Sequence, residues 1–121
     1  MLYKSHLEVP VFKLAHKLTL EIYRATEKFP RSEIYGIISQ LRRAMASIPA
    51  NIVEGFYRKS RKELIQFLII SRGSCGEVRY FLLLSKDLGY VNVDKYLELD
   101  SLVEEIHKQL NGWIRSLKAG A

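Results

Sequence analysis

Cysteine, proline and long apolar runs are all scarce in this chain of 121 residues, and each scarcity excludes a class of protein. Cys75 is the one cysteine, so no disulfide can form within the chain and a disulfide-stapled scaffold is excluded. Because only three residues are proline and 48% are hydrophobic, the chain is not disordered. The longest nearly apolar runs, LIQFLIIS and YFLLLS, are too short to span a bilayer. The opening MLYKSHLEVP has no apolar signal core, so we expect a cytoplasmic protein with no membrane partner.

Alternating strand patterns are also missing, and apolar residues instead recur at three- and four-residue steps, which is typical of helices that bury one face. The pattern predicts four helices, at about residues 11–28, 33–56, 61–88 and 93–118, in a single domain spanning residues 1–121. Representative apolar positions are Leu18 and Ile22, Leu41 and Ile48, Leu68 and Leu82, and Leu99 and Leu110. The connections are short, so consecutive helices must reverse direction. The predicted fold is therefore all-α, an antiparallel up-down four-helix bundle.

Proline and serine mark the ends of the first two predicted helices. Pro10 fits the first turn of the first helix, and Pro30 pushes the residue before it away from helical geometry. We expect the side chain of Ser32 to cap the second helix, with Glu33 in its first turn. Pro49 lies inside that helix, but the apolar pattern continues in phase across it, so we expect a kink there rather than an end.

The last two predicted helices carry cap signals as well. Ser60 and Glu63 match the reciprocal capping box that begins a helix. Gly89 suits a helix C-cap, and Asn92 suits the N-cap of the helix that follows. Small residues gather in the third helix, where they would let another backbone approach closely: Ser71, Gly73, Ser74, Cys75 and Gly76.

The most informative pattern lies between residues 29 and 77, where an apolar row and a polar row run side by side. The apolar row is Ile34, Ile38, Leu41, Met45, Ile48, Ile52 and Phe56. The polar row lies about 100° round the helix from it, at the edge of a core, where polar groups need partners. We interpret it, with facing residues of the next helix, as a structural polar layer that fixes helix register or joins subunits: Gln40, Asn51, Glu54, Glu63, Ser74 and Glu77. A binding or catalytic site is the alternative interpretation.

The net charge of +6 is concentrated in the middle of the chain. Residues 1–30 carry five basic and three acidic side chains, residues 31–86 carry ten and four, and residues 87–121 carry four and six. Such asymmetry favours a polyanionic partner on one surface, with a merely solvated basic face as the alternative.

Basic residues recur along the third predicted helix. Arg72, Arg79 and Lys86 lie seven residues apart and so share one helix face, drifting only about 20° per step. Rows of this kind suit phosphate contacts, which supply affinity without reading base sequence. Together with a basic connection and an arginine pair, the candidate nucleic-acid-binding residues are Arg42, Arg43, Arg58, Lys59, Arg61, Lys62, Arg72, Arg79 and Lys86. The sequence has no RRM or helix-turn-helix signature, so it indicates no residues that would recognise specific bases.

Sequence signals for catalysis, metals and cofactors are weak. None of the three histidines has a second ligand at helical spacing, and Glu54, Glu63 and Glu77 could converge but lack the Glu-x-x-His motifs of metal-binding bundles. The serines have no assignable histidine base. The GSCGE segment sits inside a helical pattern with no strand before it, unlike a phosphate-cradling loop. We therefore expect no enzymatic activity, no metal and no cofactor.

Several short motifs between residues 29 and 77 resemble those of a known family. They are Phe29-Pro30, Glu33 with Tyr35-Gly36, Gln40 to Ala44, Ser47-Ile48-Pro49 with Asn51-Ile52, Glu54-Gly55, Arg58, Ser60, Glu63, Phe67-Leu68 and Gly73-Ser74 with Glu77. On these residues the chain is similar, over nearly its whole length, to the 23S rRNA intervening-sequence proteins, often described simply as four helix bundle proteins. Val53 stands where the family usually has alanine, and Cys75-Gly76 replaces more ordinary residues, neither of which disturbs the fold.

The resemblance implies a left-handed up-down bundle that assembles as a homopentamer, often with a positively charged central pore. Some genes of the family lie within insertions in ribosomal RNA genes, which describes a gene location and not an activity. A related branch is the accessory variability determinant of diversity-generating retroelements, which binds a reverse transcriptase and nucleic acid. The ending Leu110 to Arg115 is similar to the corresponding region of that branch.

Charge pattern and resemblance together predict a non-enzymatic, oligomeric protein that binds nucleic acid, with structured RNA or duplexes preferred by charge and shape. Its expected partners are other copies of itself and RNA or DNA. One alternative is the retroelement accessory role, with a reverse transcriptase and its template RNA as partners. The other alternative is a protein-interaction scaffold that never touches nucleic acid.

Overall fold

Helices account for nearly all of the structure, a computed structural model that describes residues 3–120. The elements are η1 (His6–Glu8), α1 (Pro10–Thr26), η2 (Arg31–Glu33), α2 (Ile37–Phe56), α3 (Arg61–Asp87) and α4 (Val93–Ala119), where η marks a short 3₁₀ helix. No strand occurs within residues 3–120. The prediction of an all-α chain with four helices is confirmed.

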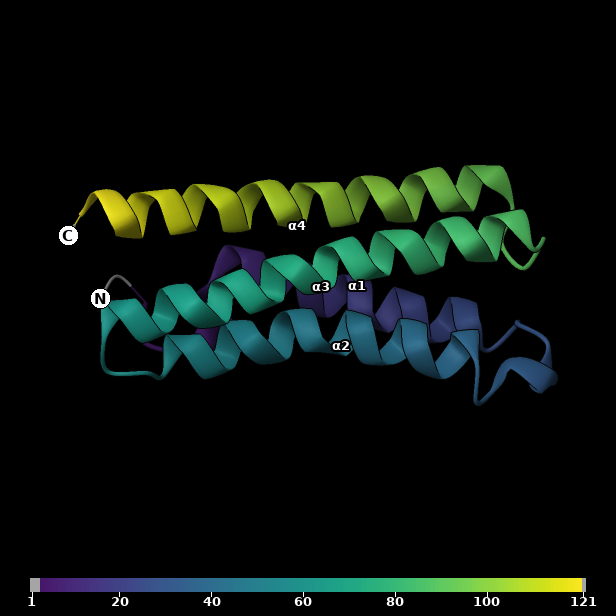
Figure 1. The fold of residues 1–121 in the computed structure, drawn as a ribbon, viewed down its shortest axis with the longest axis horizontal. Helices are drawn as coiled ribbons and strands as arrows, with labels where there is room; N and C mark the ends of the chain where they lie inside the picture. The colour runs from purple at the N-terminus through teal and green to yellow at the C-terminus, as the bar shows by residue number, and fades with distance from the viewer. Residues whose placement is uncertain (1–2, 121) are drawn as a thin grey trace.

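The four long helices lie side by side along the long axis of the molecule (Figure 1). α2 packs against α3, α3 packs against α4, and α1 packs against both α2 and α4. Figure 1 places both chain termini and the α2–α3 connection at one end, which we call the terminal end. The α1–α2 and α3–α4 connections lie at the opposite end, the far end.

The apolar rows of the four helices meet in one core. Every helix contributes side chains that are less than 2% exposed. The largest of them are Leu18, Ile22, Leu41, Met45, Ile48, Ile52, Leu68, Leu82, Leu99, Ile106 and Leu110. Burying a side chain of this size removes it from water at a gain of about 1.5–3 kcal/mol. The three- and four-residue spacing therefore identified the buried face of each helix.

The start of α2 differs from the prediction, because Ser32 does not cap it. Residues Arg31–Glu33 form the 3₁₀ turn η2, and α2 begins at Ile37 after Gly36. Glu33 takes the capping role instead: its Oε1 accepts from the backbone N–H of Ile37 at 3.4 Å. A carboxylate is well placed there because the N-terminus of a helix carries partial positive charge. As a result Ile34 lies outside α2 and outside the core, at 39% exposure.

Two far-end connections are joined through the same carboxylate. α3 ends at Asp87 with Leu88 as its C-cap, Gly89 follows with a φ of +80° that suits glycine, and Tyr90 N–H donates back to Ser85 O at 2.9 Å. This is the Schellman arrangement, in which the predicted glycine takes the left-handed position directly after the C-cap residue Leu88. Tyr90 then reaches across so that its hydroxyl donates to Glu33 Oε2 at 2.8 Å.

The other caps match the sequence signals. Ser60 Oγ accepts from Glu63 N–H at 3.1 Å, and Asn92 Oδ1 accepts from Lys95 N–H at 2.7 Å. α1 begins at Pro10 as expected but ends at Thr26, two residues before the predicted end. α2 runs through Pro49 without ending, as predicted, while the kink itself stays a prediction.

The α2–α3 pair is packed closely enough to use small residues. Ser71 Oγ donates to the carbonyl of Ile48 at 2.9 Å, and Ser47 Oγ and Ser74 Oγ lie 2.8 Å apart. A Cβ on Gly55 would lie 2.9 Å from Cβ of Phe67, so glycine is required at this crossing. The small residues on the inner side of α3 therefore serve packing within the chain.

Candidate nucleic-acid interface

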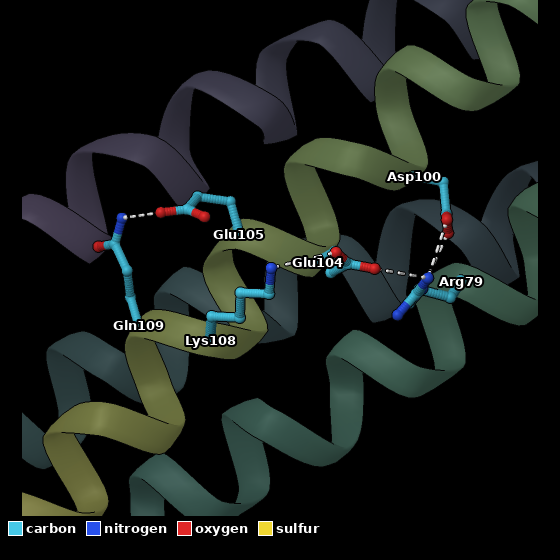
Figure 2. Close-up of polar contacts among 6 residues, drawn as sticks. All are labelled: Arg79, Asp100, Glu104, Glu105, Lys108 and Gln109. Carbon is cyan, nitrogen blue, oxygen red and sulfur yellow. Dashed lines mark hydrogen bonds and ion pairs between the residues drawn. The ribbon is translucent and has the colours of Figure 1, made fainter.

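Arg79, in the middle of the predicted basic row, reaches from α3 to α4. Its Nε and Nη2 donate to the two carboxylate oxygens of Asp100, each at 2.9 Å, and Nη2 lies 3.5 Å from Glu104. Figure 2 shows this contact between the two helices, with Lys108 on the other side of Glu104. A bidentate pair between a guanidinium and a carboxylate is both directional and strong. Arg79 thus links α3 to α4, and its charge is balanced locally.

The hydrogen bond to Asp100 is also the main cause of a raised pKa of Arg79, although partial burial opposes it. The guanidinium therefore remains charged at all ordinary pH values. The acidic last segment noted in the sequence accounts for this pairing, because α4 places its carboxylates against α3.

The two other members of the row have different surroundings. Arg72 Nη1 donates to the neutral Asn111 Oδ1 at 3.0 Å, so its charge is not compensated by that partner. Lys86 Nζ lies 3.4 Å from Asp87 Oδ1 and 4.9 Å from the centre of the Tyr96 ring. The seven-residue spacing correctly placed the three cations on one face, but that face is turned partly into the α3–α4 groove rather than fully to solvent.

The arginine pair on α2 is engaged with neighbouring helices. Arg42 Nε donates to Thr26 Oγ1 at 2.8 Å, and its guanidinium carbon lies 4.6 Å from the centre of the Tyr23 ring. Arg43 donates to Glu77 on α3. These contacts tie α2 to α1 and to α3, so both arginines have a structural role whatever they bind.

The predicted basic connection lies at the terminal end, and its four cations are exposed. Arg58 pairs with Glu54 and lies 3.9 Å from Glu63. Arg61 Nη1 donates to the carbonyl of Gly120 at 2.6 Å, next to the end of α4. Within residues 3–120, Lys59 and Lys62 have no ion-pair or hydrogen-bond partner for their side chains. The connection therefore keeps most of its positive charge free.

The predicted polar layer is only in part a link between helices. Ser74 and Glu77 connect α3 to α2, through Ser47 and Arg43 respectively. Gln40 and Asn51 make side-chain hydrogen bonds within α2 alone. Glu54 and Glu63 share Arg58, and Glu77 lies with another arginine, so the three glutamates do not form one cluster.

A further basic row, on α1, was not singled out from the sequence. Lys13, Lys17, Arg24 and Lys28 are all exposed, and none has a side-chain partner in the part of the chain that the structure describes. Lys13, Lys17 and Arg24 lie within about 40° of the circumference of α1, and Lys28 follows two residues after the helix ends at Thr26. Counting net charge by segment did not reveal this row, because three glutamates offset five cations over residues 1–30. A helical plot of α1 by charge would have found it.

The described residues form no metal-binding cluster, and the one cysteine is buried. No group of three or more His, Cys, Asp or Glu side chains within residues 3–120 is placed to hold a metal ion. Burial raises the pKa of the Cys75 thiol from 9.0 to about 12, with nearby Arg79 opposing the rise, so the thiol is protonated and unreactive at neutral pH. No helix in the described part of the chain is both long and apolar enough to cross a membrane.

The outward side of the α2–α3 pair is open and partly apolar. Ile70 and Tyr80 are 50% and 57% exposed on the outer face of α3. Between them, a Cβ added to Gly73 or Gly76 would meet nothing within 4 Å. Large exposed apolar groups beside small residues are typical of a surface that another helix covers. We call these four residues the α3 outer face.

Two comparisons with known proteins place the chain in a family. A solved structure from Bacteroides thetaiotaomicron, described as a protein of unknown function from the S23 ribosomal protein family, is similar to this chain. The TM-score is 0.78 at 25% sequence identity, over 86% of this chain and 97% of that one. No curated protein matches the chain. The sequence model of the 23S rRNA-intervening sequence proteins matches residues 8–112, so the chain belongs to the 23S rRNA-intervening sequence protein family.

Proposed function

We propose that this protein is a non-enzymatic nucleic-acid-binding protein that holds structured RNA or duplexes through their phosphates. The observation that carries the proposal is a set of exposed cations with no side-chain partner within residues 3–120: Lys13, Lys17, Arg24, Lys28, Lys59 and Lys62. Unpaired surface cations bind the phosphate backbone favourably because they displace its condensed counterions into solution.

The paired arginines have a secondary place in this proposal. Arg43, Arg58 and Arg79 already contact carboxylates, so a phosphate would have to compete for them. Arg42, Arg61 and Arg72 donate to neutral oxygen atoms and keep their full charge. The predicted set of nine phosphate-contacting residues thus divides into cations that are free and cations that also hold helices together.

We further propose that the chain is an antiparallel up-down subunit of a symmetric oligomer. The α3 outer face supplies the apolar surface and the close approach that such an interface needs. The resemblance noted from the sequence implies a homopentamer, in which the basic rows of single subunits would combine into a larger cationic surface.

Fluorescence anisotropy tests the nucleic-acid proposal directly. A labelled structured RNA and a labelled DNA duplex are titrated with the protein at several salt concentrations, and the mass of the protein is checked by light scattering. We expect affinity to fall steeply as salt rises, and to fall less steeply in the variants Lys13→Gln/Lys17→Gln and Lys59→Gln/Lys62→Gln, because each lost phosphate contact reduces the log–log slope by about one.

A matched control is the variant Lys95→Gln/Lys108→Gln. It also removes two cations, but both lysines are paired with glutamates of α4, Glu98 and Glu104. Its affinity should stay within about twofold of wild type. If the wild-type oligomer binds neither polymer even at low salt, the nucleic-acid proposal is wrong and a protein-interaction scaffold becomes the better explanation.

The retroelement accessory role remains the alternative within the same class. It predicts tight association with a reverse transcriptase, which a pull-down with a purified enzyme of that type would detect. A general nucleic-acid binder would show no such association after nuclease treatment.

A further inference from the structure

A hollow of about 230 Å³ lies between α3 and α4 and is lined mainly by cations. Arg72 comes from α3 and Arg115 and Lys118 come from α4, while Asn111 and Ile114 complete the lining. None of the five lining residues is acidic. Arg115 and Lys118 were not among the residues proposed above, so this hollow adds a distinct site to the basic surface.

The sequence brings these groups together through helical spacing. Positions 111, 115 and 118 follow steps of four and three residues, so they share one face of α4. Arg72 faces them from α3, and its contact with Asn111 Oδ1 at 3.0 Å orients its guanidinium without neutralising it. Guanidinium groups held in this way match the geometry of phosphate oxygens.

The hollow differs in charge from the rest of the α3–α4 groove. Seven residues along the same row, Arg79 lies against Asp100 and Glu104, so two carboxylates face one guanidinium there. All six acidic residues of the last segment precede position 106, whereas Arg115 and Lys118 follow it. The groove therefore has no excess positive charge around Arg79 and is cationic toward the terminal end, where it can hold an anion.

The neighbouring basic connection extends the cationic surface beyond the hollow. Arg61 Nη1 donates to the carbonyl of Gly120, which places a further guanidinium beside the end of α4. A ligand with several phosphates could contact the hollow and the connection at once. A lipid surface fits less well, because Ile114, the one apolar residue of the lining, is buried and cannot insert into a membrane.

We propose that this hollow binds a backbone phosphate of an RNA strand, with Arg72, Arg115 and Lys118 as the contacting cations. The proposal deepens the function proposed above and rests on it. The strand continues from the hollow to the basic connection, so the contacts of this site lie toward the terminal end of the bundle.

The variant Arg115→Gln/Lys118→Gln tests the proposal, with Lys95→Gln/Lys108→Gln as its control on the same helix. We expect RNA affinity to fall on the order of tenfold at moderate salt and the log–log salt slope to fall by about two. The control loses the same number of charges and should keep both quantities near their wild-type values. Equal losses in the two variants would overturn the site, because only overall charge would then matter.

A second probe separates failure of the site from failure of the function. Inorganic phosphate is titrated into the wild-type protein while NMR follows the side-chain amide of Asn111 and the Nε–H of Arg115. Selective shifts of these signals without RNA binding would leave an anion site in the hollow but would overturn the proposed function and, with it, RNA as the ligand of the hollow. RNA binding that the double variant leaves unchanged overturns the site alone.

Two further ligands identify the source of the phosphate. Oligonucleotides with a 5′-phosphate and with a 5′-hydroxyl should bind equally, since a backbone phosphate is present in both. A strong preference for the 5′-phosphate would overturn the backbone assignment in favour of strand ends. Tighter binding to anionic phospholipid vesicles than to RNA, lost in the double variant, would overturn the RNA assignment.

Discussion

Arg72 and Arg79 lie one heptad apart on the same face of α3, yet they have different chemistry because α4 presents different residues to them. Arg79 meets Asp100 and Glu104 and becomes a link between helices. Arg72 meets Asn111 and keeps its charge available. A row of identical cations in the sequence is therefore not a row of equivalent binding groups, since each one depends on the side chain across the groove.

Cys75 gives a prediction at the same scale. Its folded-state pKa, about 12, lies above the ordinary value of 9.0 because burial disfavours the thiolate. The thiol should therefore react with a disulfide reagent much more slowly in the native protein than in urea. The raised pKa also contributes stability that is complete below pH 9 and is lost as pH rises toward 12.

Both outcomes can be measured against the variant Cys75→Ala. Thiol labelling rates in native and unfolded wild-type protein test the burial, and urea unfolding from pH 8 to pH 11 tests the linkage. Wild type should lose more stability than Cys75→Ala over this range. Rapid native labelling, or identical pH dependence in the two proteins, would contradict the prediction.

Element ends were the hardest feature to predict, and the start of α2 explains why. Ser32 had the right residue type for a cap, but Glu33 has a side chain long enough to accept from Ile37 N–H and from the Tyr90 hydroxyl together. Tyr90 lies 57 positions along the chain from Glu33, so no local pattern could have shown the contact. Capping that depends on a distant residue is a tertiary effect.

The α3–α4 contact gives a prediction about both stability and binding. Replacing Asp100 with alanine removes the fork contact to Arg79 and should lower the free energy of unfolding by about 1–2 kcal/mol, a range reduced for partial exposure. The same change frees the Arg79 guanidinium, so RNA affinity should rise. Urea unfolding and anisotropy measure the two effects.

Glu105→Ala is the matched control for this prediction. It removes one negative charge from the same helix, but within residues 3–120 the one hydrogen bond of the Glu105 side chain is accepted from Gln109 Nε2 of α4, at 3.3 Å. Figure 2 shows this contact. An affinity gain in Asp100→Ala that exceeds the gain in the control would assign Arg79 to the nucleic-acid surface. Equal gains would mean that Arg79 serves only to join the helices.

At the scale of the whole molecule, substitutions in the α3 outer face test whether this face joins subunits into an oligomer. In a lone subunit, Gly73→Ala and Gly76→Ala meet open space, so each should stabilise α3 by up to about 1 kcal/mol through helix propensity. In an oligomer that uses these glycines for close approach, the added methyl groups should weaken association instead. Light scattering over a range of concentrations and thermal unfolding distinguish the two results.

Gly112→Ala on α4 serves as the reference substitution. It too meets nothing within 4 Å, and it lies outside the α3 outer face. We expect Gly112→Ala to leave the oligomer mass unchanged while Gly73→Ala/Gly76→Ala reduces it. An unchanged mass in both variants would show that the α3 outer face is not the interface.

The periodicity of apolar residues was sufficient to determine the helical class, the number of helices and the buried face of each, because a helix that buries one side repeats this requirement every three to four residues. The caps at Ser60, Gly89 and Asn92 were also predictable, since each acts within its own turn. Only the tertiary structure decided which cations are neutralised and which are free. That difference depends on residues brought together from separate helices, such as Arg79 with Asp100 and Arg72 with Arg115, and spacing along one helix carries no information about them.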